Sequence, residues 1–168
     1  IEIILSHAEE FQNSNIPRQN ILGVLLSLLS ISSKAKMAKD CFNTLCQNIS
    51  VSPTESDLKM ILSSIMTPNQ FVRTTVLETL DEEFDLQPHM KCPAEIFISL
   101  FDEEESNREY AQMIWETNSF KLEESVMSNL LQNFFQQEDS GLRLFIARAY
   151  ANAAKLLGDM ENGKSSNK

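Results

Sequence analysis

The fold is decided by the run Pro68-Asn-Gln-Phe-Val-Arg-Thr-Thr-Val-Leu-Glu-Thr-Leu80, because its pattern returns at an interval of 35 residues. The arginines that mark three copies are Arg73, Arg108 and Arg143. Apolar residues recur one position before, three after and seven after each arginine, with one exception. These positions hold Val72, Val76 and Leu80 around Arg73; Asn107, Ala111 and Trp115 around Arg108; and Leu142, Ile146 and Tyr150 around Arg143. A fourth copy without the arginine holds Met37, Ala38, Cys41 and Leu45. These offsets lie on one stripe of an α-helix, and only Asn107 is polar, so we predict four helices that bury the same face.

A second helix precedes each of these helices. In the clearest case apolar residues recur at helical spacing, namely Leu58, Ile61, Leu62, Ile65 and Met66. Ser52-Pro-Thr-Glu55 and Thr67-Pro-Asn-Gln70 each combine a capping hydroxyl, an early proline and a Glu or Gln, which is typical of a helix start. The sequence predicts first helices near 18–32, 54–66, 93–101 and 122–136, and second helices near 35–49, 68–84, 104–119 and 140–157. Residues 1–12 would be the second helix of a preceding, truncated pair.

Short helix pairs of this kind bury a continuous core only when they stack. We therefore predict an all-α fold, a right-handed α-solenoid of about four and a half repeats over residues 1–157. Residues 158–168 are polar and are expected to form a linker or tail. The chain starts without Met, which favours an excerpt of a longer protein. A compact orthogonal helix bundle is the alternative.

Composition narrows the classes of function. The 168 residues carry a formal net charge of −10, which excludes a protein that follows nucleic-acid backbone over most of its surface. Four scattered glycines leave no phosphate-binding loop. Cys41, Cys46 and Cys92 are an odd number at irregular spacing, so we expect no disulfide framework and a reducing compartment. The longest apolar run is too short to cross a bilayer, and we expect a cytoplasmic protein without membrane or DNA partners.

The sequence offers no arrangement typical of an enzyme. The acidic runs 81–83 and 102–105 fall at predicted helix ends, where carboxylates are usually solvated. His89 and Cys92 form a single pair, whereas a structural zinc needs four ligands. Trp115 and Tyr150 occupy the buried stripe and are interpreted as core. We predict no catalysis, no metal site and no cofactor.

The pattern resembles the HEAT repeat, in which a turn with Asp or Pro leads into a helix bearing Val-Arg. Asp102 stands in the turn position six residues before Arg108. Thr67 and Gln137 hold that position in the other copies. We therefore do not expect every repeat to pair a turn Asp with the Arg of a neighbouring repeat. The tetratricopeptide repeat has a similar period, but its early Trp and the Gly that follows are absent here.

One stretch is more specific: Phe101-Asp-Glu-Glu-Glu-Ser-Asn-Arg-Glu-Tyr-Ala-Gln-Met-Ile-Trp-Glu116, followed by Phe120-Lys-Leu122. It resembles the N-terminal HEAT-repeat region of the very large activators of the general-control kinase, which phosphorylates the alpha subunit of translation initiation factor two. The resemblance implies binding to stalled or collided ribosomes and relay of amino-acid-starvation signals, a stress response. The family's contacts with the kinase and with an ATP-binding-cassette partner lie in other regions.

The acidic turns are candidates for an interaction surface, because turns between the paired helices recur along one edge of a solenoid. The candidate residues are Asp102, Glu103, Glu104, Glu105, Glu138 and Asp139. A negative edge attracts basic protein segments and repels phosphate, so we expect contact with ribosomal protein rather than ribosomal RNA, or a role as a spacer. The alternatives are a generic HEAT scaffold or transport protein (karyopherin-like, adaptin-like or phosphatase-scaffold-like) that binds basic segments, and an unrecognised enzyme.

Overall fold

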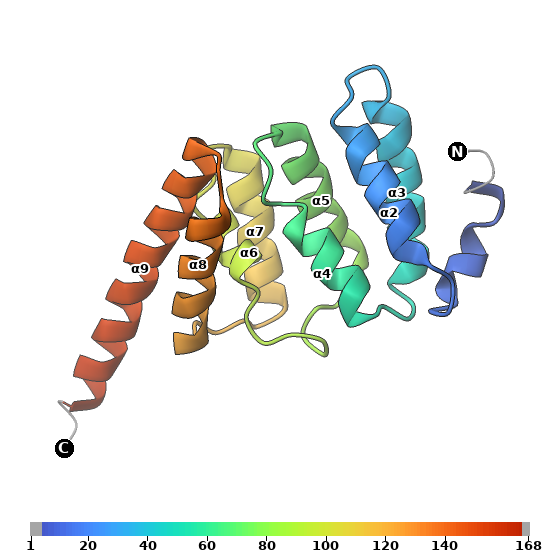
Figure 1. Ribbon diagram of the computed structural model, residues 1–168. Helices are drawn as coiled ribbons and strands as arrows, with labels where there is room; N and C mark the ends of the chain where they lie inside the picture. The colour runs from blue at the N-terminus through green and yellow to red at the C-terminus, as the bar shows by residue number, and fades with distance from the viewer. Residues whose placement is uncertain (1–4, 166–168) are drawn as a thin grey trace. The chain divides into compact units, whose positions relative to one another are not determined.

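The computed structural model describes residues 5–165, and every regular element in that range is helical (Figure 1). The elements are the 3-10 helix η1 (Ala8–Gln12) and the α-helices α2 (Arg18–Leu29), α3 (Ala35–Ile49), α4 (Glu55–Ser63), α5 (Gln70–Glu83), α6 (Ala94–Ser99), α7 (Glu105–Thr117), α8 (Glu124–Gln136) and α9 (Ser140–Ser165). The chain divides into two compact units, Ile1–His89 and Met90–Lys168. The predicted all-α class and the alternation of first and second helices are confirmed.

Helix ends differ from the prediction at both termini of the chain. The second helix expected over 1–12 is represented by η1 alone, and residues 1–4 lie outside the described range. Helix α9 begins at Ser140 as predicted but continues to Ser165, through residues expected to form a linker. A polar composition favours a linker but does not by itself prevent helix formation.

Two helix N-caps lie two residues later than the capping hydroxyls Ser52 and Thr67 predicted from the sequence. The N-cap of α4 is Thr54 rather than Ser52, and Thr54 forms a capping box with Asp57. The N-cap of α5 is Asn69 rather than Thr67, and its side chain accepts a hydrogen bond from the backbone nitrogen of Val72. In both cases the residue after the proline carries the side-chain oxygen that satisfies a free N–H of the first turn.

In the first unit, α2 packs against α3, α4 and α5, and α3 packs against η1 and α5. The apolar faces meet in a core without measurable exposure, which includes Leu22, Phe42, Leu45, Ile61 and Leu80. Polar links join successive pairs at their margins. Lys39 of α3 forms an ion pair with Glu78 of α5, and the hydroxyl of Thr79 donates to the side-chain oxygen of Asn43 at 2.9 Å.

A buried ion pair joins α2 to α4. Nη2 of Arg18 lies 2.5 Å from Oδ2 of Asp57, and neither side chain is exposed to solvent. The same guanidinium donates to the carbonyls of Phe11 and Ser52, both at 3.0 Å. Asp57 also accepts hydrogen bonds from Gln19 and from the backbone and hydroxyl of Thr54. The pair therefore fixes four segments of the first unit relative to one another.

In the second unit, α6 packs against α7, α8 and α9, and α8 packs against α9. Trp115 lies between Phe97 and Phe120, with ring centroids 5.4 and 5.7 Å away. Helix α7 ends at Thr117, and Ser119, just beyond the C-cap Asn118, has a positive φ of 53°. The backbone nitrogen of Phe120 reaches the carbonyl of Trp115, and that of Ser119 reaches Glu116, which is the Schellman arrangement with its apolar contact.

Candidate interaction surface

The three arginines occupy equivalent positions in successive second helices. Arg73 is the fourth residue of α5, Arg108 the fourth of α7 and Arg143 the fourth of α9. Ala38 is likewise the fourth residue of α3. The 35-residue spacing in the sequence is therefore a repeat in the structure.

The turn before each arginine is closed in the same way by a different residue. The side-chain oxygen six positions before the arginine accepts a hydrogen bond from the backbone nitrogen two positions later. Thr67 accepts from Asn69 at 3.3 Å, Asp102 from Glu104 at 3.0 Å, and Gln137 from Asp139 at 3.0 Å. Because Thr, Asp and Gln all have a suitable oxygen, the turn persists where the Asp typical of the repeat is missing.

Two of the arginines hold this turn through its carbonyls. Nη1 of Arg73 donates to the carbonyls of Thr67 at 3.0 Å and Pro68 at 3.1 Å. Nη1 of Arg108 donates to the equivalent carbonyls of Asp102 at 2.7 Å and Glu103 at 2.8 Å. The guanidinium of Arg143 instead lies over the ring of Phe134, 4.8 Å from its centroid. Arg73 and Arg108 therefore have a structural role in the turn, whereas Arg143 contacts the preceding helix.

The predicted buried stripe is found at most, but not all, of its positions. Nine of its twelve flanking positions are buried, and Trp115 and Tyr150 are half-buried. Met37, expected on the buried face, is 45% exposed. Asn107, the polar member, is fully buried and donates to Oδ2 of Asp102 at 3.0 Å.

The candidate acidic residues do not all reach the surface. Asp102 is 3% exposed, and its two oxygens accept from Glu104 and Asn107. Including Asp102 in an exposed interaction surface was therefore wrong, since its carboxylate is used inside the turn. The other five, here called the acidic edge, are exposed or half-buried: Glu103, Glu104, Glu105, Glu138 and Asp139.

The two halves of the acidic edge belong to corresponding turns of the second unit. Glu103 and Glu104 lie in the α6–α7 turn and Glu105 begins α7, whereas Glu138 and Asp139 lie in the α8–α9 turn. Both turns are at the same end of the unit's helices, the upper end in Figure 1. Asp139 also caps α9 by accepting from the backbone nitrogen of Leu142 at 2.9 Å. The edge can offer negative charge to a partner, but it holds no paired groups for acid–base chemistry.

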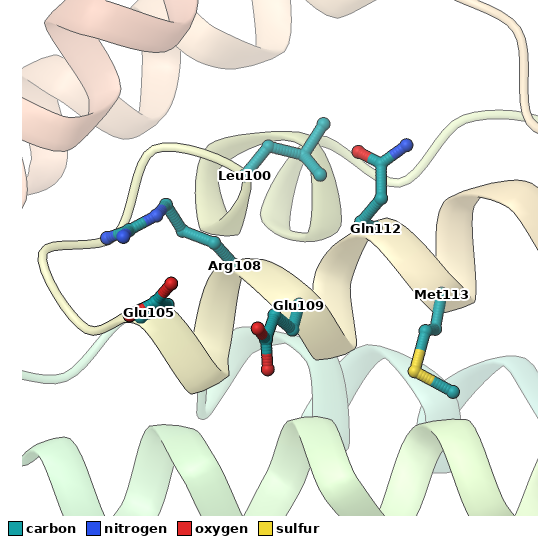
Figure 2. Close-up of a pocket in the computed structure, with 6 residues that line it drawn as sticks. All are labelled: Leu100, Glu105, Arg108, Glu109, Gln112 and Met113. Carbon is teal, nitrogen blue, oxygen red and sulfur yellow. The ribbon is translucent and has the colours of Figure 1, made fainter.

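A shallow hollow of about 520 Å³ lies beside the acidic edge along α7. It is lined by Leu100, Glu105, Arg108, Glu109, Gln112 and Met113. In Figure 2 these side chains follow α7 from Glu105 and Arg108 in its first turn to Met113, and Leu100 comes from the end of α6. Sequence reasoning missed the hollow, because Leu100 meets α7 only in the folded unit.

The described part of the chain shows neither a metal-binding cluster nor an activated cysteine. Residues 5–159 contain no group of three or more His, Cys, Asp or Glu side chains that could hold a metal ion. Cys41 and Cys46 are fully buried, as predicted, and burial raises the pKa of both thiols. Burial also raises the pKa of Cys92 to about 11. No helix among the described residues is long and apolar enough to span a membrane.

The chain is similar to known proteins both at the level of its repeats and over nearly its whole length. Residues 83–162 match the family described as the HEAT repeats of the stalled ribosome sensor GCN1, the repeat class that the arginine spacing predicts. Over 165 residues the chain is 56% identical to the eIF-2-alpha kinase activator GCN1 of Saccharomyces cerevisiae, a match that covers 98% of the chain and 6% of that protein. No solved structure matches the chain. The resemblance to the kinase activators is confirmed, and the chain is a HEAT segment of the GCN1 type.

Proposed function

We propose that this chain is a non-catalytic HEAT segment of a ribosome-bound, cytoplasmic activator of the initiation-factor-two-alpha kinase. It would serve as scaffold and protein-interaction surface on stalled or collided ribosomes during amino-acid starvation. The observation that carries the proposal is the 56% identity over 98% of the chain to the yeast activator. The chain spans 6% of the length of that relative, so the kinase and an ATP-binding-cassette partner would bind elsewhere in the parent protein.

The charge of the chain supports protein rather than RNA as the contacted ribosomal component. The formal net charge is −10, and the acidic edge places five carboxylates at one end of the second unit. Phosphate backbone is repelled by such a surface, whereas the basic tails of proteins are attracted to it. In the half of the edge that precedes α7, the turn is held by Arg108, which donates to the carbonyls of Asp102 and Glu103.

Sedimentation of the full-length parent protein tests the ribosomal role. The protein is expected to move with intact polysomes and to return to the top of the gradient after the ribosomes are dissociated. A protein that stays at the top while polysomes are intact would contradict the proposal. That result, combined with capture of basic cargo segments, would favour the generic scaffold or transport alternative.

A matched pair of variants tests the acidic edge within that protein. Glu103→Lys with Glu138→Lys reverses two exposed charges of the edge, and Glu82→Lys with Asp85→Lys makes the same charge change in the first unit. The first variant is expected to lower polysome association more than the second. Equal effects would show that only net charge matters, and tight binding of the chain to naked ribosomal RNA at physiological salt would overturn the preference for protein.

A further inference from the structure

We propose that the hollow along α7 binds a basic amphipathic segment of a partner protein, with an apolar side chain of that segment against Leu100 and Met113 and its lysines or arginines beside Glu105 and Glu109. The site shares Glu105 with the acidic edge, but it is a face of α7 with apolar side chains rather than a row of turns. The proposal does not require that the partner be ribosomal.

The apolar part of the hollow includes Met113, which is exposed although other apolar side chains of α7 are buried. The other aliphatic side chains of this helix, Ala111 and Ile114, are buried against α6 and its neighbours, but Met113 is 52% exposed. Leu100, at the end of α6, is half-buried and lines the same hollow on the other side of α7 (Figure 2). Methionine side chains are flexible and polarisable, so they adapt to differently shaped apolar partners.

The negative charge around these apolar side chains favours a positively charged partner. Residues 102–116 contain six carboxylates and one arginine. The arginine, Arg108, already donates to the two carbonyls of its turn. Within the described chain Glu105 and Glu109 have no ion-pair partner, whereas Glu116 accepts from Gln112. Two free carboxylates beside an apolar floor complement a segment that carries positive and apolar side chains, and they repel nucleic acid and acidic peptides.

Charge alone would not hold such a segment. Exposed ion pairs each contribute little and are screened at physiological salt, so the seating of an apolar side chain must supply much of the affinity. Amphipathic helices use this combination when they lie in a groove, with apolar residues at helical spacing toward the protein. The expected ligand is therefore a short helix with lysines flanking leucines.

The test uses the 168-residue chain and a synthetic peptide of about 12 residues, with leucine at helical spacing and lysine elsewhere. Two control peptides replace all leucines with alanine or all lysines with glutamate. Glu109→Lys and Met113→Ala alter the hollow, and Glu82→Lys makes the same charge change in the first unit. Binding is measured by fluorescence anisotropy, and circular dichroism verifies that each variant folds.

The lysine–leucine peptide is expected to bind, and Glu109→Lys is expected to weaken binding about tenfold. Met113→Ala is expected to weaken it about threefold, and Glu82→Lys less than twofold. Both control peptides should bind at least about tenfold more weakly. Absence of binding, equal effects of Glu109→Lys and Glu82→Lys, or equal affinity of the alanine peptide would each overturn the proposal. Since no ribosome is present, these outcomes are independent of the sedimentation results.

Discussion

Replacement of Asp57 by alanine is expected to be among the most destabilising single changes in the first unit. The substitution leaves the guanidinium of Arg18 buried, with no carboxylate beside it. It also removes the acceptor used by Gln19 and by the backbone and hydroxyl of Thr54, and so dismantles the capping box of α4.

The magnitude follows from the burial of the pair. Both side chains have an exposed fraction of 0%, and removal of one partner from such a pair costs about 3–5 kcal/mol. A typical domain has a free energy of unfolding of about 5–15 kcal/mol, so the loss is a large fraction of the total. With an m-value of about 2 kcal/mol/M in urea, the midpoint should fall by about 1.5–2.5 M.

Urea unfolding followed by circular dichroism measures this effect, and a double-mutant cycle separates its origin. Arg18→Met removes the buried charge, so the double variant with Asp57→Ala should be more stable than the two separate losses add up to. A loss below about 1 kcal/mol for Asp57→Ala, or strict additivity in the cycle, would refute the interpretation of Arg18 and Asp57 as a tightly coupled buried pair.

Three further predictions concern other sites. Thr54→Ala should cost about 1 kcal/mol in urea unfolding, because it removes the N-cap of α4 but leaves the Arg18–Asp57 pair; no change would contradict the observed cap. Asn107→Ala should cost about 1–3 kcal/mol, since Asp102 loses a buried donor, and an equally stable variant would show that the bond is dispensable. Folding keeps the Cys92 thiol protonated up to a pKa of about 11, so the free energy of unfolding should fall as the pH rises from about 9 to about 11. A Cys92→Ala variant that shows the same fall in this window would contradict that assignment.

The repeat could be predicted from the sequence because it depends on local periodicity. A helix buries the residues at fixed offsets, and the spacing of Arg73, Arg108 and Arg143 therefore appears directly in the order of residues. The helix starts were less accurate, because several neighbouring side chains could act as the cap and only the folded backbone selects among them. Asn69, rather than Thr67, has the geometry that reaches the first turn of α5.

The Arg18–Asp57 pair could not be predicted in the same way. Its members are 39 residues apart, which does not fit the 35-residue period, and Asp57 lies in the first turn of a helix, where acidic residues are common. The burial of Asp102 was missed for a related reason. It belongs to a run of four acidic residues, and composition cannot tell which member turns inward to accept from Asn107.

The proposed function requires that the helix pairs of this GCN1-type segment support activation of the kinase on the ribosome. The most direct measurement replaces the matching segment of the yeast activator with this chain and follows phosphorylation of initiation factor two alpha during amino-acid starvation. A protein that lacks the segment provides the reference. The account predicts that the chimera restores phosphorylation and polysome association that the deletion loses. A stable, full-length chimera that restores neither would contradict it.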